Sequence, residues 1–204
     1  MKTYTRNVLV TGFVAMTCTF GVVDQTSAQG MVLLGDNSFA RRCFQAADRA
    51  ALTQMANDDD IEQCTSALDL GGLKPSDRVA TLVNRGVLFS AQENYTAAKK
   101  DYLRALKIRG HGGEVYANIG NLDFLLRDYD QALVNYAKAI EMGMPRVHVA
   151  HVNRGMVFEN LDQLDMAKME YQTAIEIAPE WKKATELLLR VEKKQAKLKS
   201  LKSQ

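Results

Sequence analysis

Three stretches of the chain repeat one pattern of small and aromatic residues. Residues 84–105, 118–139 and 153–174 read NRGVLFSAQENYTAAKKDYLRA, NIGNLDFLLRDYDQALVNYAKA and NRGMVFENLDQLDMAKMEYQTA. The columns that they share are Gly86, Gly120 and Gly155; Ala98, Ala132 and Ala167; Tyr102, Tyr136 and Tyr171; and Ala105, Ala139 and Ala174. The glycines lie 34 and then 35 residues apart, and self-similarity at such a period indicates a repeat architecture.

This pattern resembles the tetratricopeptide repeat, a 34-residue unit of two helices joined by a turn. The resemblance implies an all-α fold, a right-handed superhelical solenoid of antiparallel helix pairs. In each unit the Gly and the first Ala lack bulk, so the two helices can approach closely, and the Tyr fills the space beside them. One departure is Asp123, which stands where the second repeat is expected to have a large residue.

Outside the three repeats, the chain is expected to contain one irregular helix pair and a capping helix. Residues 60–68 fit the second helix of a repeat, with Cys64 in the Tyr column, so the first helix would span residues 39–55. The expected units are a signal peptide (1–28), a flexible mature N-terminus (29–38), an irregular helix pair (39–78), repeats at 79–112, 113–147 and 148–181, and a C-terminal capping helix (182–204). The lysines from Lys193 to Lys202 are read as the solvated face of that cap, and the alternative is a nucleic-acid or membrane contact.

The N-terminus has the order of a secretory signal peptide. Lys2 and Arg6 precede an apolar stretch from Val8 to Val23, and small residues lead to an expected cleavage after Ala28. The alternative is a retained membrane anchor, for which this stretch is short and rich in Thr and Gly. We therefore expect a periplasmic or secreted protein with no membrane span after cleavage.

Cleavage removes Cys18 and leaves Cys43 and Cys64 in an oxidising compartment, where paired thiols tend to form a disulfide. In the irregular pair, Cys43 near the start of one helix would face Cys64 toward the end of its antiparallel partner. The alternative is two buried thiols that act as small hydrophobic groups.

The resemblance implies a protein–protein interaction module, in which the first helices of the repeats line a concave groove that holds a partner polypeptide. Asn84, Asn118 and Asn153 share one position and would form a ladder of carboxamides along this groove; equally, Asn is common at that position without any ligand. The other expected groove residues are Val87, Asn121, Phe124, Met156, Glu159 and Asn160, with Arg85 and Arg154 at the edge or in solvent. Val83, Ala117 and Val152 occupy the positions where some relatives carry the Lys that grips a terminal carboxylate, so that mode is not expected.

Other classes of function receive little support from the sequence. The formal charge of +2 offers no broad attraction to nucleic acid. His148 and His151 are spaced like a metal pair but have no further ligand nearby, and residues 58–60 fit a helix start better than a calcium loop. We therefore expect no enzyme, no cofactor and no metal. The main alternative is a self-associating structural or assembly factor of the cell envelope.

Overall fold

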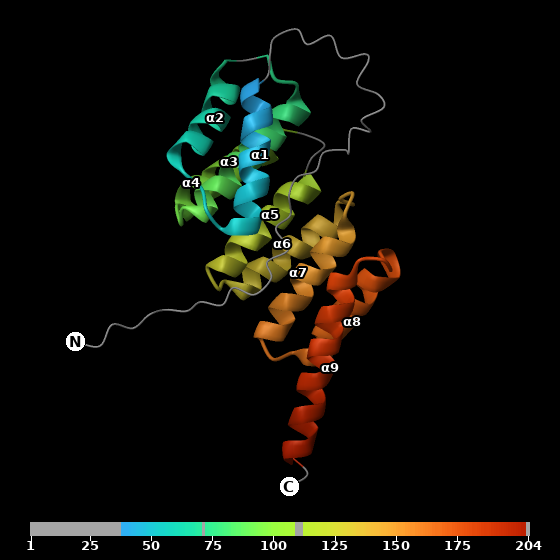
Figure 1. The fold of residues 1–204 in the computed structure, drawn as a ribbon. Coiled ribbons are helices and arrows are strands. Elements are labelled where there is room, and N and C mark those ends of the chain that lie inside the picture. The colour runs from blue at the N-terminus through green and yellow to red at the C-terminus, as the bar shows by residue number, and fades with distance from the viewer. Residues whose placement is uncertain (1–37, 71, 109–111, 203–204) are drawn as a thin grey trace, which may run out of the picture.

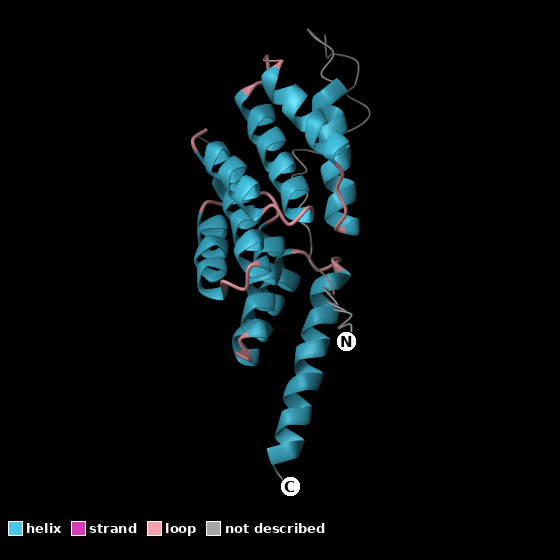
Figure 2. Cartoon of the chain, turned by 90° about the vertical axis from the view of Figure 1, so that its left-hand side faces the viewer, coloured by secondary structure: helices cyan, strands magenta, loops and turns pink. Residues whose placement is uncertain are grey.

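The computed structural model describes residues 38–70, 72–108 and 112–202, which form nine α-helices and no strand (Figures 1 and 2). The helices are α1 (Ser38–Thr53), α2 (Asp58–Asp69), α3 (Pro75–Ala91), α4 (Tyr95–Leu106), α5 (Gly112–Leu125), α6 (Tyr129–Glu141), α7 (Val147–Asn160), α8 (Leu164–Ile177) and α9 (Lys182–Lys202). Consecutive helices pack in pairs from α1–α2 to α7–α8, and α9 packs on α8. The predicted all-α stack of helix pairs is confirmed.

The N-terminal predictions fall largely outside this description. The signal peptide (1–28), Cys18 and residues 29–37 of the expected flexible segment lie outside the described residues. Ser38, assigned to that segment, is the first residue of α1. The first helix ends at Thr53 and not at the expected residue 55, because Gln54 adopts a left-handed φ of 57°. No helix among the described residues is both long and apolar enough to cross a bilayer.

Each repeat is held together by a contact between a glycine and a tyrosine ring. Tyr136 is fully buried, and a methyl group on Gly120 would lie 2.8 Å from its Cε1 atom. The ring of Tyr171 is equally close to Gly155, at 2.6 Å. The alanine columns beside these rings are fully buried, so no larger side chain fits between the two helices.

Charged residues also join the two helices of the first and third repeats. Arg85 donates to both carboxylate oxygens of Asp101, at 2.6 and 2.9 Å, and Arg154 donates to Glu170 at 2.6 Å. Both arginines therefore bind the second helix of their own repeat and do not lie free in solvent. In the middle repeat, the buried Asp123 accepts a hydrogen bond from Asn135 Nδ2 at 2.6 Å. Burial raises the pKa of Asp123, although this hydrogen bond opposes the rise.

The acidic residues at 58–60 begin α2. Asn57 accepts a hydrogen bond from the Asp60 backbone N–H at 2.8 Å, and Asp60 accepts one from the Asn57 N–H at 3.2 Å, which together form a capping box. Asp60 also pairs with Arg49 of α1 at 2.7 Å. Residues 58–60 thus fix the start of a helix and its packing on the preceding one.

The last helix covers the end of the stack. Ala184, Leu187 and Val191 of α9 are buried, with Ala184 and Val191 fully so. Beyond them the helix extends past the rest of the molecule, and Leu198 and Leu201 are exposed (Figure 1). The proximal part of α9 thus closes the core that the last repeat would otherwise leave open.

The first helix pair is held by a disulfide. Cys43 of α1 and Cys64 of α2 are fully buried and bonded to each other, with their Cα atoms 4.7 Å apart. The predicted pairing is confirmed. Around it the core consists mainly of small residues, Ala46, Ala47 and Ala50, so the two helices lie close together.

We expect the double variant Cys43→Ala, Cys64→Ala to lose about 3 kcal/mol of unfolding free energy, because the bond closes a loop in the unfolded chain. The two cysteines are 21 residues apart. Urea unfolding followed by far-UV circular dichroism measures the loss. Dithiothreitol should lower the midpoint of the native protein and leave that of the variant unchanged; coincident native curves with and without the reductant would contradict the expectation.

The contact between Gly120 and Tyr136 predicts that Gly120→Ala changes the unfolding free energy in opposite directions with and without the tyrosine ring. Gly120→Ala should destabilise the native protein by about 1 kcal/mol, since overpacking against the Tyr136 ring outweighs the gain in helix propensity. In a Tyr136→Leu background the same change should stabilise by a few tenths of a kcal/mol to about 1 kcal/mol. A double-mutant cycle from urea unfolding measures both effects. The same sign in both backgrounds would show that the ring does not require the glycine.

Candidate partner-binding groove

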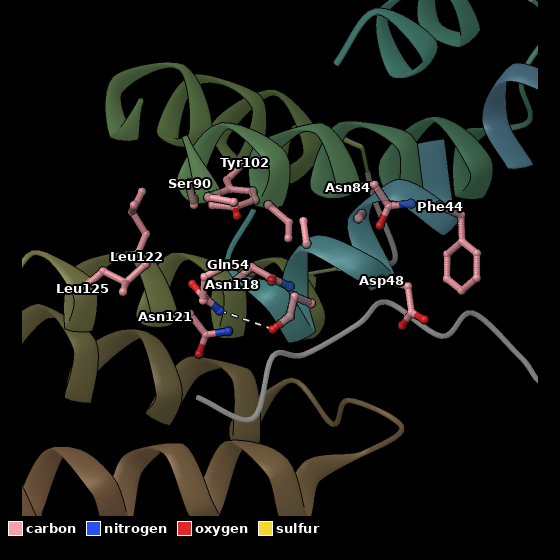
Figure 3. A pocket seen from close by; sticks show the side chains of 15 residues that line it. Phe44, Asp48, Gln54, Asn84, Ser90, Tyr102, Asn118, Asn121, Leu122 and Leu125 are labelled. Atoms are coloured by element: carbon pink, nitrogen blue, oxygen red, sulfur yellow. Dashed lines mark hydrogen bonds between the residues drawn. The ribbon is translucent and has the colours of Figure 1, made fainter. Parts of the chain in front are cut away.

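A groove opens between the first helices of the first three pairs, α1, α3 and α5 (Figure 3). Its volume, including the mouth, is about 640 Å³, and Tyr102 of α4 forms part of its base. Apolar side chains line it from all three first helices: Phe44 from α1, Val87 from α3, and Leu122 and Leu125 from α5. Polar side chains lie among them, so the groove offers both apolar contact and hydrogen bonds.

The three asparagines of the expected ladder have different surroundings. Asn84, Asn118 and Asn153 are all at most 4% exposed, and only Asn84 and Asn118 line the groove. Asn118 Nδ2 donates to the Glu114 carbonyl at 2.9 Å within its own helix. The Asn84 side chain lines the groove, and its carboxamide makes no hydrogen bond within the described residues and is not among the buried unpaired polar groups.

Asn153 belongs to a network that connects neighbouring repeats. Its Nδ2 donates to Asn121 Oδ1 at 2.9 Å, and the same oxygen accepts the Tyr136 hydroxyl at 2.7 Å. The Asn153 Oδ1 atom is buried and has no hydrogen-bond partner. Burial raises the pKa of Tyr136, so its hydroxyl stays protonated and remains a donor. Asn121 lines the groove, but its oxygen already accepts from both of these donors.

Four other expected groove residues are not among those that line this part of the groove. Phe124 stacks on Tyr129 with ring centroids 5.6 Å apart, and Met156 is 7% exposed in the core of the last repeat. Asn160 donates to the Met156 carbonyl at 2.8 Å. Glu159 binds Arg190 of α9, at 2.8 and 3.0 Å. The capping helix thus engages the Glu159 carboxylate through Arg190.

Sequence reasoning missed the wall that α1 provides. Phe44, Asp48 and Ala51 line the groove at the spacing of one helix face, and Gln54 follows at the helix end. That spacing was the available signal, but α1 lacks the Asn and Gly columns that identify the first helix of the other units. Asp48 is the one charged side chain among the described residues that line the groove.

The two histidines have separate partners. His148 packs edge-on against Trp181 with centroids 4.9 Å apart, and burial and then Arg146 lower its pKa. His151 Nδ1 lies 2.9 Å from Glu170 Oε2. Burial opposes ionisation of Glu170, but the contacts from His151 and Arg154 outweigh it and lower its pKa. Across the described ranges, no group of three or more His, Cys, Asp or Glu side chains is arranged to hold a metal ion.

Comparison with known families agrees with this arrangement. The family model of the tetratricopeptide repeat matches residues 79–111, 113–142 and 148–180. The chain is a tetratricopeptide repeat protein. Repeats of this family are protein–protein interaction modules, and their fold is that of a non-enzymatic scaffold.

Two named relatives share the repeats with this tetratricopeptide repeat protein. Heat shock protein STI1 from Saccharomyces cerevisiae is 32% identical over 68 residues, which are 33% of this chain and 12% of that protein. Dynein axonemal assembly factor 4 from Pongo pygmaeus is 30% identical over 105 residues, which are 48% of this chain and 25% of that protein. The chain therefore spans a quarter or less of the length of these relatives.

Solved structures support the fold over a longer range. Residues 41 to the end of MamA from Desulfovibrio magneticus RS-1 align with a TM-score of 0.56 and 17% identity, covering 81% of this chain and 89% of that one. Another MamA crystal structure aligns with a TM-score of 0.53 and 16% identity, covering 79% of this chain and 85% of that one. At such identities the similarity concerns the fold alone.

Two asparagines of the groove differ in their hydrogen bonds, and this difference gives a prediction about stability. Asn121→Ala should cost about 2 kcal/mol of unfolding free energy, because it leaves the Tyr136 hydroxyl and the Asn153 amide without their acceptor. Asn84→Ala should change stability by less than about 0.5 kcal/mol, since no hydrogen bond is lost. Urea unfolding of both variants tests the contrast. Equal losses would mean that Asn84 also has a structural role.

Proposed function

We propose that this protein binds an extended segment of a partner polypeptide in the groove between α1, α3 and α5. The observation that carries the proposal is the Asn84 carboxamide, which lines the groove, is 4% exposed and has no hydrogen-bond partner among the described residues. A carboxamide that lines a groove and is not engaged by the protein can both donate to and accept from the backbone of a ligand.

The composition of the groove fits a peptide better than a small polar metabolite. An extended backbone presents N–H and C=O groups at regular intervals, and a carboxamide can both accept from and donate to them. Val87 and Leu125, which are partly exposed, provide apolar surface for the side chains between these contacts. The mixture of amides and aliphatic groups therefore matches a backbone with apolar side chains.

The proposed setting is an oxidising compartment, the periplasm or the outside of the cell. The Cys43–Cys64 bond supports it, because structural disulfides persist in such compartments and are rare in a reducing cytosol. The basic and apolar order of residues 1–28 supports it independently. In this setting, the protein would bind a partner of the cell envelope or of the secreted fraction.

A pair of matched substitutions tests the groove. Val87→Trp should fill the groove and abolish capture of partner polypeptides from an extract of the producing cells, while Val134→Trp should leave capture unchanged. Val87 lines the groove, whereas Val134 lies on α6 outside it and is 45% exposed. Pull-down with quantitative mass spectrometry compares the two variants with the native protein.

Both variants must first show native circular dichroism and unfolding midpoints. A partner that the Val87→Trp variant still captures would place binding on another surface and contradict the proposal. Light scattering on the same samples covers the alternative of self-association: a stable homo-oligomer of the native protein that Val87→Trp disrupts would make a second copy the occupant of the groove.

A further inference from the structure

The groove contains one acidic side chain whose charge is not balanced within the described residues. Asp48 is partly buried on α1, lines the groove and forms no ion pair there. The other acidic residues nearby have partners: Asp60 binds Arg49 at 2.7 Å, and Asp58 accepts from Gln92 at 3.0 Å. A partly desolvated carboxylate without a cation favours a ligand that brings one.

The cations of α1 do not fill this role. Arg49 is engaged with Asp60 of α2, and Arg42 donates to Ser38 at 3.1 Å and lies over the Phe39 ring. Arg41 is exposed and does not line the groove. All the other side chains that line it are uncharged, so the Asp48 carboxylate sets the sign of the charge that a ligand meets.

An aromatic ring beside the carboxylate suits a long basic side chain. Phe44 precedes Asp48 by four residues, so the two lie on one face of α1, and Figure 3 shows both on the same side of the groove. The methylene groups of Lys or Arg can pack on the Phe44 ring while the charged end reaches the carboxylate. Phe44 is 36% exposed, which leaves ring surface for this contact.

Apolar surface lies at the other end of the groove. Leu125 is partly exposed there, and Figure 3 shows it on the opposite side of the groove from Asp48 and Phe44. A basic side chain and an apolar side chain of one extended ligand would therefore occupy the two ends.

From these contacts we infer that the occupant of the groove is an extended peptide with a Lys or Arg side chain paired with Asp48 and an apolar side chain near Leu125. The inference rests on the proposed function and adds the charge and the apolar character of the segment that is bound. A terminal carboxylate is not expected at this end of the groove, because it would meet Asp48 and no cation among the described lining residues.

A synthetic peptide library tests the inference with defined probes. The probes are fluorescent octapeptides, acetylated and amidated, in which each position in turn holds Lys, Glu, Gln or Leu on a Gly/Ser background. Binding is measured by fluorescence anisotropy at about 150 mM salt, which screens interactions between distant charges. Peptides that carry both Lys and Leu should bind the native protein about tenfold more tightly than the same peptides with Gln for Lys.

Three variants separate the carboxylate from general charge effects. Asp48→Asn should abolish the preference for Lys, and Asp48→Lys should reverse it in favour of Glu. Asp130→Asn removes one negative charge from an exposed position on α6 and should leave the preference intact. Val87→Trp should abolish binding of every peptide. The expected stability of Asp48→Asn equals that of the native protein, since Asp48 has no ion pair to lose.

Three other outcomes would contradict the inference or the proposed function. Peptides that bind the native protein but not Val87→Trp, with no preference for Lys, would overturn the role of Asp48 and leave groove binding in place. A preference for Lys that Asp130→Asn weakens as much as Asp48→Asn would also overturn it, because the effect would then be one of net charge. If no peptide binds the native protein more tightly than Val87→Trp, both the inference and the proposed function fail.

Discussion

The structure depends on the close approach of two helices at a glycine that faces a tyrosine ring. Because a methyl group at Gly120 would meet the ring of Tyr136, that ring sets how closely the paired helices approach. The flanking alanines, fully buried in every repeat, allow the same close approach on either side of the ring. The same kind of contact recurs in all three repeats, and similar units stack with their first helices side by side.

The same core contact determines which groove amides are available. The Tyr136 hydroxyl donates to Asn121 Oδ1, and the same oxygen also accepts from Asn153 of the next unit. This amide is therefore already engaged within the protein. The corresponding hydroxyl of Tyr171 binds Glu159, which α9 holds through Arg190. Between α1 and α5, in contrast, the described residues leave a groove open at the surface.

The repeats were predictable because their determinants recur in the sequence. Gly, Ala and Tyr at fixed positions indicate steric contacts within one unit, and these contacts depend only on the spacing of residues along that unit. The groove was predictable only in part. Asn153 and Arg154 form hydrogen bonds to residues of other helices, and the repeated pattern of the sequence does not indicate those contacts. The wall formed by α1 was not predicted, because its residues Phe44 and Asp48 have no equivalents at matching positions in the repeats.

The disulfide takes the place of the glycine–tyrosine contact in the pair that lacks it. Cys64 stands in the Tyr column, and its bond to Cys43 brings the two helices together among alanines, where no ring is present to set their spacing. Cys43 precedes Phe44, so the bond also fixes the start of the wall that faces the groove. In the regular repeats noncovalent contacts position the first helix, whereas α1 packs on α2 and α3 and is in addition bonded covalently to α2. Asp48 and Asn84 lie on different helices, so the proposed groove requires α1 to be in place before both can act on the same ligand.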